Sequence, residues 1–176
     1  KDLSSVKIVL SGVGAAGNAI ARLLTLSGAK NIIGFNHHGV IHNDMKSEDS
    51  MQQWFIDNSN PHSFIGTMPE ALVGADVFIG VSAPNILKEA DIATMAKDSI
   101  IFALANPDPE IDPIVARKYA TVVATGRSDQ PNQINNVLAF PGIFRGLLDA
   151  NAHKITDQLL VAAAEAIADC VSPEQL

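Results

Sequence analysis

The sequence has 176 residues, a formal net charge of −7, one cysteine, and 47% hydrophobic but only 18% charged residues. This length suits one domain with a substantial core and leaves no room for a second complete one. The negative charge argues against a nucleic-acid partner, which would call for clustered lysine and arginine, and a single cysteine excludes an internal disulfide. No apolar run approaches the ~20 residues that span a bilayer, and no charged-then-apolar leader precedes the first strand-like run. We therefore expect a cytoplasmic protein that binds neither nucleic acid nor membrane.

Short β-rich runs alternate with helical patterns along the whole chain. Each run is apolar on both faces, as in strands that lie between two layers of helices. The runs cover residues 6–11, 31–35, 75–81, 99–105 and 121–125. Because parallel strands separated by helices are joined by right-handed crossovers, the alternation predicts an α/β fold, a doubly wound parallel sheet with helices on both faces.

The helical segments show caps and apolar faces. Gly28 follows the first apolar pattern as a C-cap. A second helix is predicted to begin with Ser47 as its N-cap and to turn three large apolar side chains inward, Met51, Trp54 and Phe55. A long last helix is predicted from near Thr156, with Cys170 as a small core residue beside an apolar stripe that packs in the core. The stripe consists of Leu160, Ala163, Ala164, Ile167, Ala168 and Val171.

A glycine-rich loop with the pattern G-x-G-x-x-G follows the first strand and opens the first helix. In such a loop the first glycine permits a tight turn, the second lets the backbone approach a pyrophosphate, and the third lets helix pack closely on strand. Free N–H groups at the helix start then face the anion. Its place in a strand–helix–strand unit of about thirty residues predicts a Rossmann-type dinucleotide site, with a merely structural turn or another phosphate ligand as the alternative. The loop consists of Gly12, Val13, Gly14, Ala15, Ala16 and Gly17.

The second strand ends at Asn36, where dinucleotide sites usually offer an acid to the adenosine ribose. An amide can still bond a ribose hydroxyl, but it lacks the negative charge that repels the 2′-phosphate of NADP. NADP is therefore permitted, although no arginine or lysine stands beside Asn36, and we lean slightly to NAD. His37, His38 and His42 follow without standard zinc-ligand spacing, which favours a solvated loop.

The remaining strand ends should meet in one crevice, because ligands of such sheets sit beyond the carboxyl ends of the strands. Small residues at Val81 and Ser82 would let a flat ring or ribose lie against the backbone, and Asn106 ends the fourth run. Beyond the fifth run, the turn from Arg127 to Asp129 reads as a structural clamp, with an anion-facing Arg127 as the alternative. A loop with five side-chain amides follows, in which turn stabilisation is the ordinary role: Gln130, Asn132, Gln133, Asn135 and Asn136.

Several phrases together resemble the cofactor-binding domain of malic enzyme. They are GVGAAG, ADVFIGVSAPN, FALANPDPEI, ATGRSDQPNQINNVLAFPGIFRGLLD and LLVAAAEAIA, and the similarity extends from about Val6 to Ala168. The resemblance implies oxidative decarboxylation of malate to pyruvate and CO2, with reduction of NAD or NADP and with Mg²⁺ or Mn²⁺ in the full-length enzyme. It also implies a homo-oligomer, a dimer or larger.

The resemblance further implies that Asn106 and Asn136 lie near malate and the nicotinamide, whereas Asn135, as an adjacent loop residue, is expected to point away. The family's catalytic tyrosine and lysine and its metal-binding carboxylates belong upstream of the dinucleotide fold, so no catalytic or metal-binding residue is assigned in this chain. We expect residues 1–176 to form a single NAD(P)-binding domain, a fragment of a longer enzyme that is inactive on its own.

Two other functions fit the same residues. A malolactic enzyme, which resembles malic enzyme in fold and motifs, converts malate to lactate. A free-standing dinucleotide-binding sensor would explain the missing catalytic half but leaves Asn106 and Asn136 without an evident use.

Overall fold

The structure, a computed structural model, describes residues 2–172. It contains two compact units, which meet in the sequence between Ile134 and Asn135. The first unit carries the whole sheet, and the second carries the last two helices.

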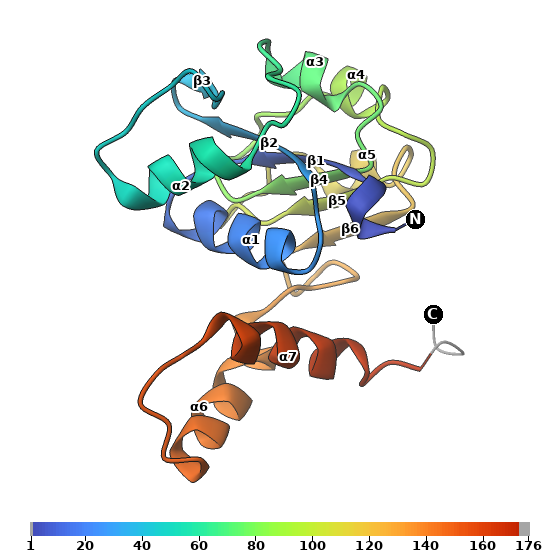
Figure 1. The fold of residues 1–176 in the computed structure, drawn as a ribbon. Helices are drawn as coiled ribbons and strands as arrows, with labels where there is room; N and C mark the ends of the chain where they lie inside the picture. The colour runs from blue at the N-terminus through green and yellow to red at the C-terminus, as the bar shows by residue number, and fades with distance from the viewer. Residues whose placement is uncertain (1, 173–176) are drawn as a thin grey trace. The chain divides into compact units, whose positions relative to one another are not determined.

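The first unit is built on a six-stranded sheet with the order β3-β2-β1-β4-β5-β6 (Figure 1). Five parallel strands match the five predicted runs: β1 (Lys7–Ser11), β2 (Asn31–Asn36), β4 (Val77–Gly80), β5 (Ile100–Ala103) and β6 (Val122–Thr125). The sixth, β3 (Gly39–Val40), pairs antiparallel with β2, and its two residues are too few to show a sequence pattern. Because β1 lies between β2 and β4, the strand order reverses there, and the carboxyl ends of β1 and β4 flank the crevice where such sheets bind ligands. The predicted doubly wound sheet is confirmed.

Two hydrophobic cores, one on each face of the sheet, follow from the alternation of side chains along each strand. In β1, Ile8 and Leu10 belong to one core and Val9 to the other. Residues of α1 (Ala15–Leu26) and α2 (Ser50–Asn58) complete the first core, and residues of α3 (Met68–Leu72), α4 (Glu89–Ile92) and α5 (Pro113–Ala116) complete the second (Figure 1). A short 3-10 helix, η1 (Leu3–Ser5), precedes β1. Burial on both faces explains why the strands read as continuous apolar runs.

The second helix begins later than predicted. Its N-cap is Asp49, whose carboxyl group accepts a hydrogen bond from a backbone N–H of the first turn at 2.8 Å. Ser47 is therefore not the cap, although both residue types suit that position. With this start Phe55 is fully buried and Trp54 half-buried, but Met51 is 45% exposed. The inward orientation predicted for Met51 is wrong, because the first turn of the helix lies at the surface.

A buried asparagine holds the loop that follows α2. Asn60 is 1% exposed and adopts a left-handed backbone conformation with φ of 48°. Its amide nitrogen donates to the carbonyl oxygens of Ile41 at 3.1 Å and Phe64 at 2.8 Å, and its amide oxygen accepts from the Phe64 N–H at 2.7 Å. Its own N–H donates to the carbonyl of Ile32 in β2 at 2.7 Å. One side chain thus ties the loop to the segment just after β3.

The second unit consists of the 3-10 helix η2 (Asn136–Leu138), α6 (Phe140–Asp149) and α7 (Asp157–Ala168). As predicted, Thr156 is the N-cap of α7, and its hydroxyl accepts from the N–H of Leu159 at 3.2 Å. An apolar groove of about 330 Å³ lies between the helices, lined by Leu138, Ala139, Gly142, Ile143, Gly146, Leu147, Leu159, Ala163, Ala166 and Ile167. None of the helices in residues 2–172 is long and apolar enough to cross a membrane.

The apolar stripe predicted for the last helix contains no fully buried residue, so its predicted packing in the core is wrong. Ala163 and Ile167 line the groove, but Val171 is 47% exposed. Cys170 is also exposed, and its thiol donates to the carbonyl of Ala166. Its predicted place in the core is wrong, because Cys170 lies beyond the end of α7 at Ala168 and no residue of that helix is fully buried.

Candidate functional site

The glycine loop joins the end of β1 to the start of α1 and is held by backbone hydrogen bonds. The N–H groups of Gly12 and Val13 both donate to the carbonyl of Phe35 in β2, at 2.9 and 3.1 Å. Gly12 has φ of +100°, and a Cβ atom there would lie 2.6 Å from the carbonyl oxygen of Val81. A Cβ atom at Gly17 would overlap the carbonyl of Gly12. These two glycines are therefore required by the fold itself.

The fold itself does not require a glycine at Gly14, the middle glycine of the loop. Gly14 has φ of −106°, which any residue can adopt, and a Cβ atom there would have no neighbour within 4 Å. Gly14 is also the N-cap of α1 and supplies no capping side chain. Among the described residues, no group accepts a hydrogen bond from the N–H of Ala15 or Ala16. The loop thus leaves open space in front of free helix-terminal donors, an arrangement that suits an anion.

These donors open into a pocket of about 510 Å³, a volume typical of sites for small ligands. It is lined by Gly12, Val13, Gly14, Ala15, Ala16, Asn36, His37, Val81 and Ser82. The structure therefore brings together eight of the ten residues predicted to bind the cofactor. The two others do not line it: Gly17 is buried behind the loop, and Asn106 follows the end of β5. The open glycine, the free N–H groups and the absence of acidic side chains from the lining fit the pyrophosphate of a dinucleotide.

Asn36 forms the edge of this pocket at the turn between β2 and β3. Its amide oxygen accepts a hydrogen bond from the N–H of His38 at 2.8 Å. His37 and His38 are exposed, and their ring centroids are 3.7 Å apart. Within residues 2–172, no three histidine, cysteine, aspartate or glutamate side chains gather as a group able to hold a metal ion.

Sequence reasoning missed Glu110, whose side chain reaches the wall of the pocket. It is fully buried, and its two carboxyl oxygens accept hydrogen bonds from the N–H groups of Ser82 and Ala105, both at 3.0 Å. Ser82 also bonds Ser11 at the end of β1, with 2.8 Å between the hydroxyl oxygens. A charged residue in a proline-rich loop reads as solvated, so only the tertiary contacts identify it.

Four of the five side-chain amides in the amide-rich loop form hydrogen bonds with described residues, and one does not. Gln130 accepts from Arg117 at 2.9 Å, and the amide nitrogens of Asn132 and Gln133 donate to backbone carbonyls at 3.3 and 3.4 Å. Asn135 caps η2 by accepting from the N–H of Val137 at 3.0 Å. Asn135 thus stabilises a turn, as the ordinary role of such residues predicts, and the other three amides tie the loop to Arg117, Val123 and Gly126.

Asn136 differs from the other amides of the loop. Its side chain is exposed and forms no hydrogen bond with any described residue, and the same holds for Asn106. Asn106 belongs to the first unit and Asn136 to the second. These are the two asparagines that the sequence singled out as neighbours of a substrate, and both amides are available to a ligand.

Comparison with known proteins supplies the family. The family described as malic enzyme, NAD binding domain, matches residues 1–176. The chain belongs to the malic enzyme family. This finding confirms the predicted family and its Rossmann-type fold.

Known malic enzymes resemble the chain over its whole length. The NAD-dependent malic enzyme of Geobacillus stearothermophilus is 52% identical over 176 residues, which are 100% of this chain and 37% of that protein. The bifunctional malic/malolactic enzyme of Bacillus subtilis is 47% identical over 184 residues, 100% of this chain and 43% of that protein. The chain therefore spans about two fifths of the length of these two relatives.

The solved structure of the NAD-dependent malic enzyme from Thermotoga maritima has a TM-score of 0.91 and 44% identity, and the match covers 99% of this chain and 47% of that one. NADP-dependent malic enzymes are also related: that of Halomonas elongata is 42% identical over 96% of this chain and 40% of its own length. Relatives of both cofactor types thus share the domain.

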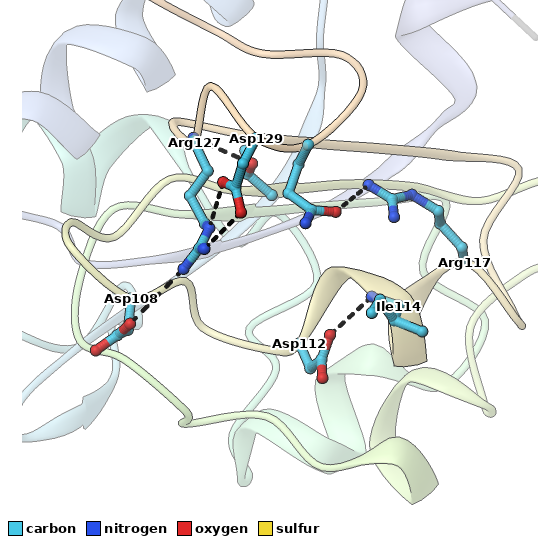
Figure 2. Close-up of polar contacts among 8 residues, drawn as sticks. Asp108, Asp112, Ile114, Arg117, Arg127 and Asp129 are labelled. Carbon is cyan, nitrogen blue, oxygen red and sulfur yellow. Dashed lines mark hydrogen bonds and ion pairs between the residues drawn. The ribbon is translucent and has the colours of Figure 1, made fainter.

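In this malic enzyme domain, Arg127 forms the predicted structural clamp (Figure 2). Its guanidinium donates to both carboxyl oxygens of Asp129, at 2.9 and 2.7 Å, and lies 4.0 Å from a carboxyl oxygen of Asp108. Hydrogen bonding from Arg127 lowers the pKa of Asp129 to about 2. Figure 2 shows Arg127 with Asp108 and Asp129 on either side of its guanidinium, which argues against an anion there.

Proposed function

We propose that this chain is the cofactor-binding domain of an enzyme that converts malate to pyruvate and CO2 with reduction of NAD or NADP. The observation that carries the proposal is the pocket at the start of α1, where Gly14 leaves room beside unbonded N–H groups. The relatives support malate as the substrate, since each is named as a malic enzyme.

Different residues of the chain would bind different parts of the cofactor and the substrate. The loop from Gly12 to Gly17 holds the pyrophosphate, Asn36 meets the adenosine ribose, and Val81 and Ser82 form the wall beside the remainder of the cofactor. When bound, the cofactor accepts the hydride. The unbonded amides of Asn106 and Asn136 orient malate and the nicotinamide carboxamide without adding charge.

Within this proposal the domain binds NAD slightly better than NADP. Asn36 is neutral, and neither lysine nor arginine lines the pocket, so a 2′-phosphate would find no cation there. The metal ion, Mg²⁺ or Mn²⁺, and the catalytic tyrosine and lysine stay predictions for the longer enzyme, as do a homo-oligomeric state and a cytoplasmic location.

Calorimetric titration of the 176-residue chain with NAD and with NADP tests the cofactor site. Gly14→Val should abolish binding by filling the space beside the free N–H groups, without loss of thermal stability. Gly126→Val is the matched control, because a Cβ atom there also has no neighbour within 4 Å and the residue does not line the pocket. Equal affinity of wild type and Gly14→Val for the cofactor would disprove the site.

The chain alone should not oxidise malate, since it contains no assigned catalytic residue. Incubation with malate, Mn²⁺ and either cofactor should leave the absorbance of reduced cofactor at its baseline. Sustained production of NADH or NADPH would overturn this part of the proposal.

A malolactic reaction is the second candidate, and the bifunctional relative from Bacillus subtilis favours keeping it. The domain does not distinguish the two, because both use the same cofactor site. Product analysis of the longer protein, pyruvate against lactate, decides between them.

A further inference from the structure

Glu110 combines complete burial with a location between two predicted sites. Burying a carboxyl group is costly unless its oxygens are hydrogen-bonded. Here each oxygen accepts one backbone N–H, from Ser82 and from Ala105. No lysine, arginine or histidine in residues 2–172 forms an ion pair with it. The two backbone donors are therefore the main compensation for its burial.

The carboxyl group of Glu110 replaces the direct backbone hydrogen bonds between the segments that follow β4 and β5. β4 and β5 pair in parallel as far as Gly80 and Ala103, and the last direct bond runs from the N–H of Leu104 to the carbonyl of Gly80 at 3.0 Å. Beyond this bond, the N–H groups of Ser82 and Ala105 donate to the two carboxyl oxygens of Glu110 and not to the backbone of the neighbouring strand. The side chain thus lets the two strands diverge while it fixes the distance between them.

Gly80 provides the space for this side chain. A Cβ atom at Gly80 would overlap the carboxyl group of Glu110. The backbone carbonyl of Glu110 also accepts from the N–H of Leu87 at 3.0 Å, which ties the loop after β4 to the loop after β5 a second time. Glu110 is therefore held at both its backbone and its side chain.

Both segments that Glu110 holds belong to the proposed function. Ser82 lines the pocket, and Ala105 directly precedes Asn106. We infer that Glu110 is a positioning residue, which sets the separation of the loops after β4 and β5 and so places the pocket wall and Asn106 together. The inference rests on the proposed function for the roles of Ser82 and Asn106, but the hydrogen bonds can be tested without a ligand.

Glu110→Gln is the informative substitution. Glutamine has nearly the same shape, but its amide NH2 is a donor where one carboxyl oxygen was an acceptor. One of the two backbone N–H groups would then face another donor, and the two loops would lose their common anchor. A residue that only fills space would tolerate this change.

The experiment compares the wild-type 176-residue chain, Glu110→Gln and the control Ile92→Val. Ile92 is buried in a core on the same sheet and forms no hydrogen bond with Ser82 or Ala105. Amide NMR should show shifts in Glu110→Gln at residues 82–85 and 104–106, in addition to those around residue 110 itself and at Leu87, and NAD affinity should fall about tenfold, the effect of one hydrogen bond. Ile92→Val should change neither. Amide shifts and NAD affinity equal to those of the control would overturn the inference.

Hydrogen exchange of the wild type tests the same hydrogen bonds even if Glu110→Gln does not fold. The N–H groups of Ser82 and Ala105 should exchange with solvent slowly, because both donate to a buried acceptor. Exchange as fast as in an open loop would refute the positioning role. If the wild type binds neither NAD nor NADP, the proposed function fails, while the amide shifts and exchange rates still decide whether Glu110 holds the loops.

Discussion

Replacing Asn60 by alanine should strongly destabilise the first unit. The substitution leaves three backbone groups without their side-chain partner: the carbonyls of Ile41 and Phe64 and the N–H of Phe64. An unsatisfied buried polar group costs about 1–3 kcal/mol, and about 1 kcal/mol for each of the three groups is a lower bound, because Phe64 is half-buried but Ile41 is fully buried. Alanine in a left-handed conformation adds about 1 kcal/mol. The free energy of unfolding should therefore fall by at least roughly 4 kcal/mol.

Urea unfolding followed by tryptophan fluorescence measures this loss. The chain has one tryptophan, Trp54, which lies in α2 just before the loop. Asn60→Gly should lose about 1 kcal/mol less than Asn60→Ala, since glycine adopts positive φ without strain. The exposed Asn58, replaced by alanine, is the control and should lose less than about 0.5 kcal/mol. A loss below 1 kcal/mol for Asn60→Ala, or equal losses for alanine and glycine, would refute the reasoning.

Three further predictions concern the loop, the cofactor and pH. Gly17→Ala should prevent folding or lower the melting temperature sharply, because its Cβ atom would overlap the carbonyl of Gly12, and circular dichroism melting checks this. Asn36→Asp should weaken NADP binding about tenfold while NAD binding changes little, since a carboxylate repels the 2′-phosphate at close range; equal effects on both cofactors would contradict it. The pKa of Asp129 is lowered in the folded chain to about 2, so its stabilising contribution is full above its unfolded value of 3.8 and is lost as the pH falls through about 2. Arg127→Met should remove this part of the acid sensitivity, seen as a shallower loss of stability between pH 4 and pH 2.

The sequence predicts the sheet and the glycine loop well because both depend on local patterns. Strands buried on both faces carry unbroken apolar runs, and the glycines of the loop have fixed spacing. The start of α2 was misplaced, since Ser47 and Asp49 are both good N-caps and only the hydrogen bonds of the first turn distinguish them. The two-residue β3 has no sequence pattern to detect.

The candidate site was predicted where backbone geometry determines it and missed where tertiary contacts do. The glycine loop meets Asn36 and Ser82 at one pocket because parallel strands end at the same edge of the sheet. Glu110 could not be found in this way. The carboxyl group of Glu110 accepts from the backbone N–H of Ser82, which lies 28 residues away in the sequence. Nothing in the local sequence distinguishes a buried acid from a solvated one.

The short β3 has a consequence for anyone who alters the cofactor preference of this domain. Unpaired strand edges promote association with other chains, and natural sheets often cover them with short or twisted segments. β3 shields the outer edge of β2 at Phe35 and Asn36, and the turn that places it there is fastened by Asn36 itself. Substitutions in residues 36–39 therefore act on solubility as well as on ligand choice. Because aspartate retains the oxygen that fastens the turn, it should keep the edge covered, whereas larger changes of this loop should be screened for aggregation before their cofactor affinities are compared.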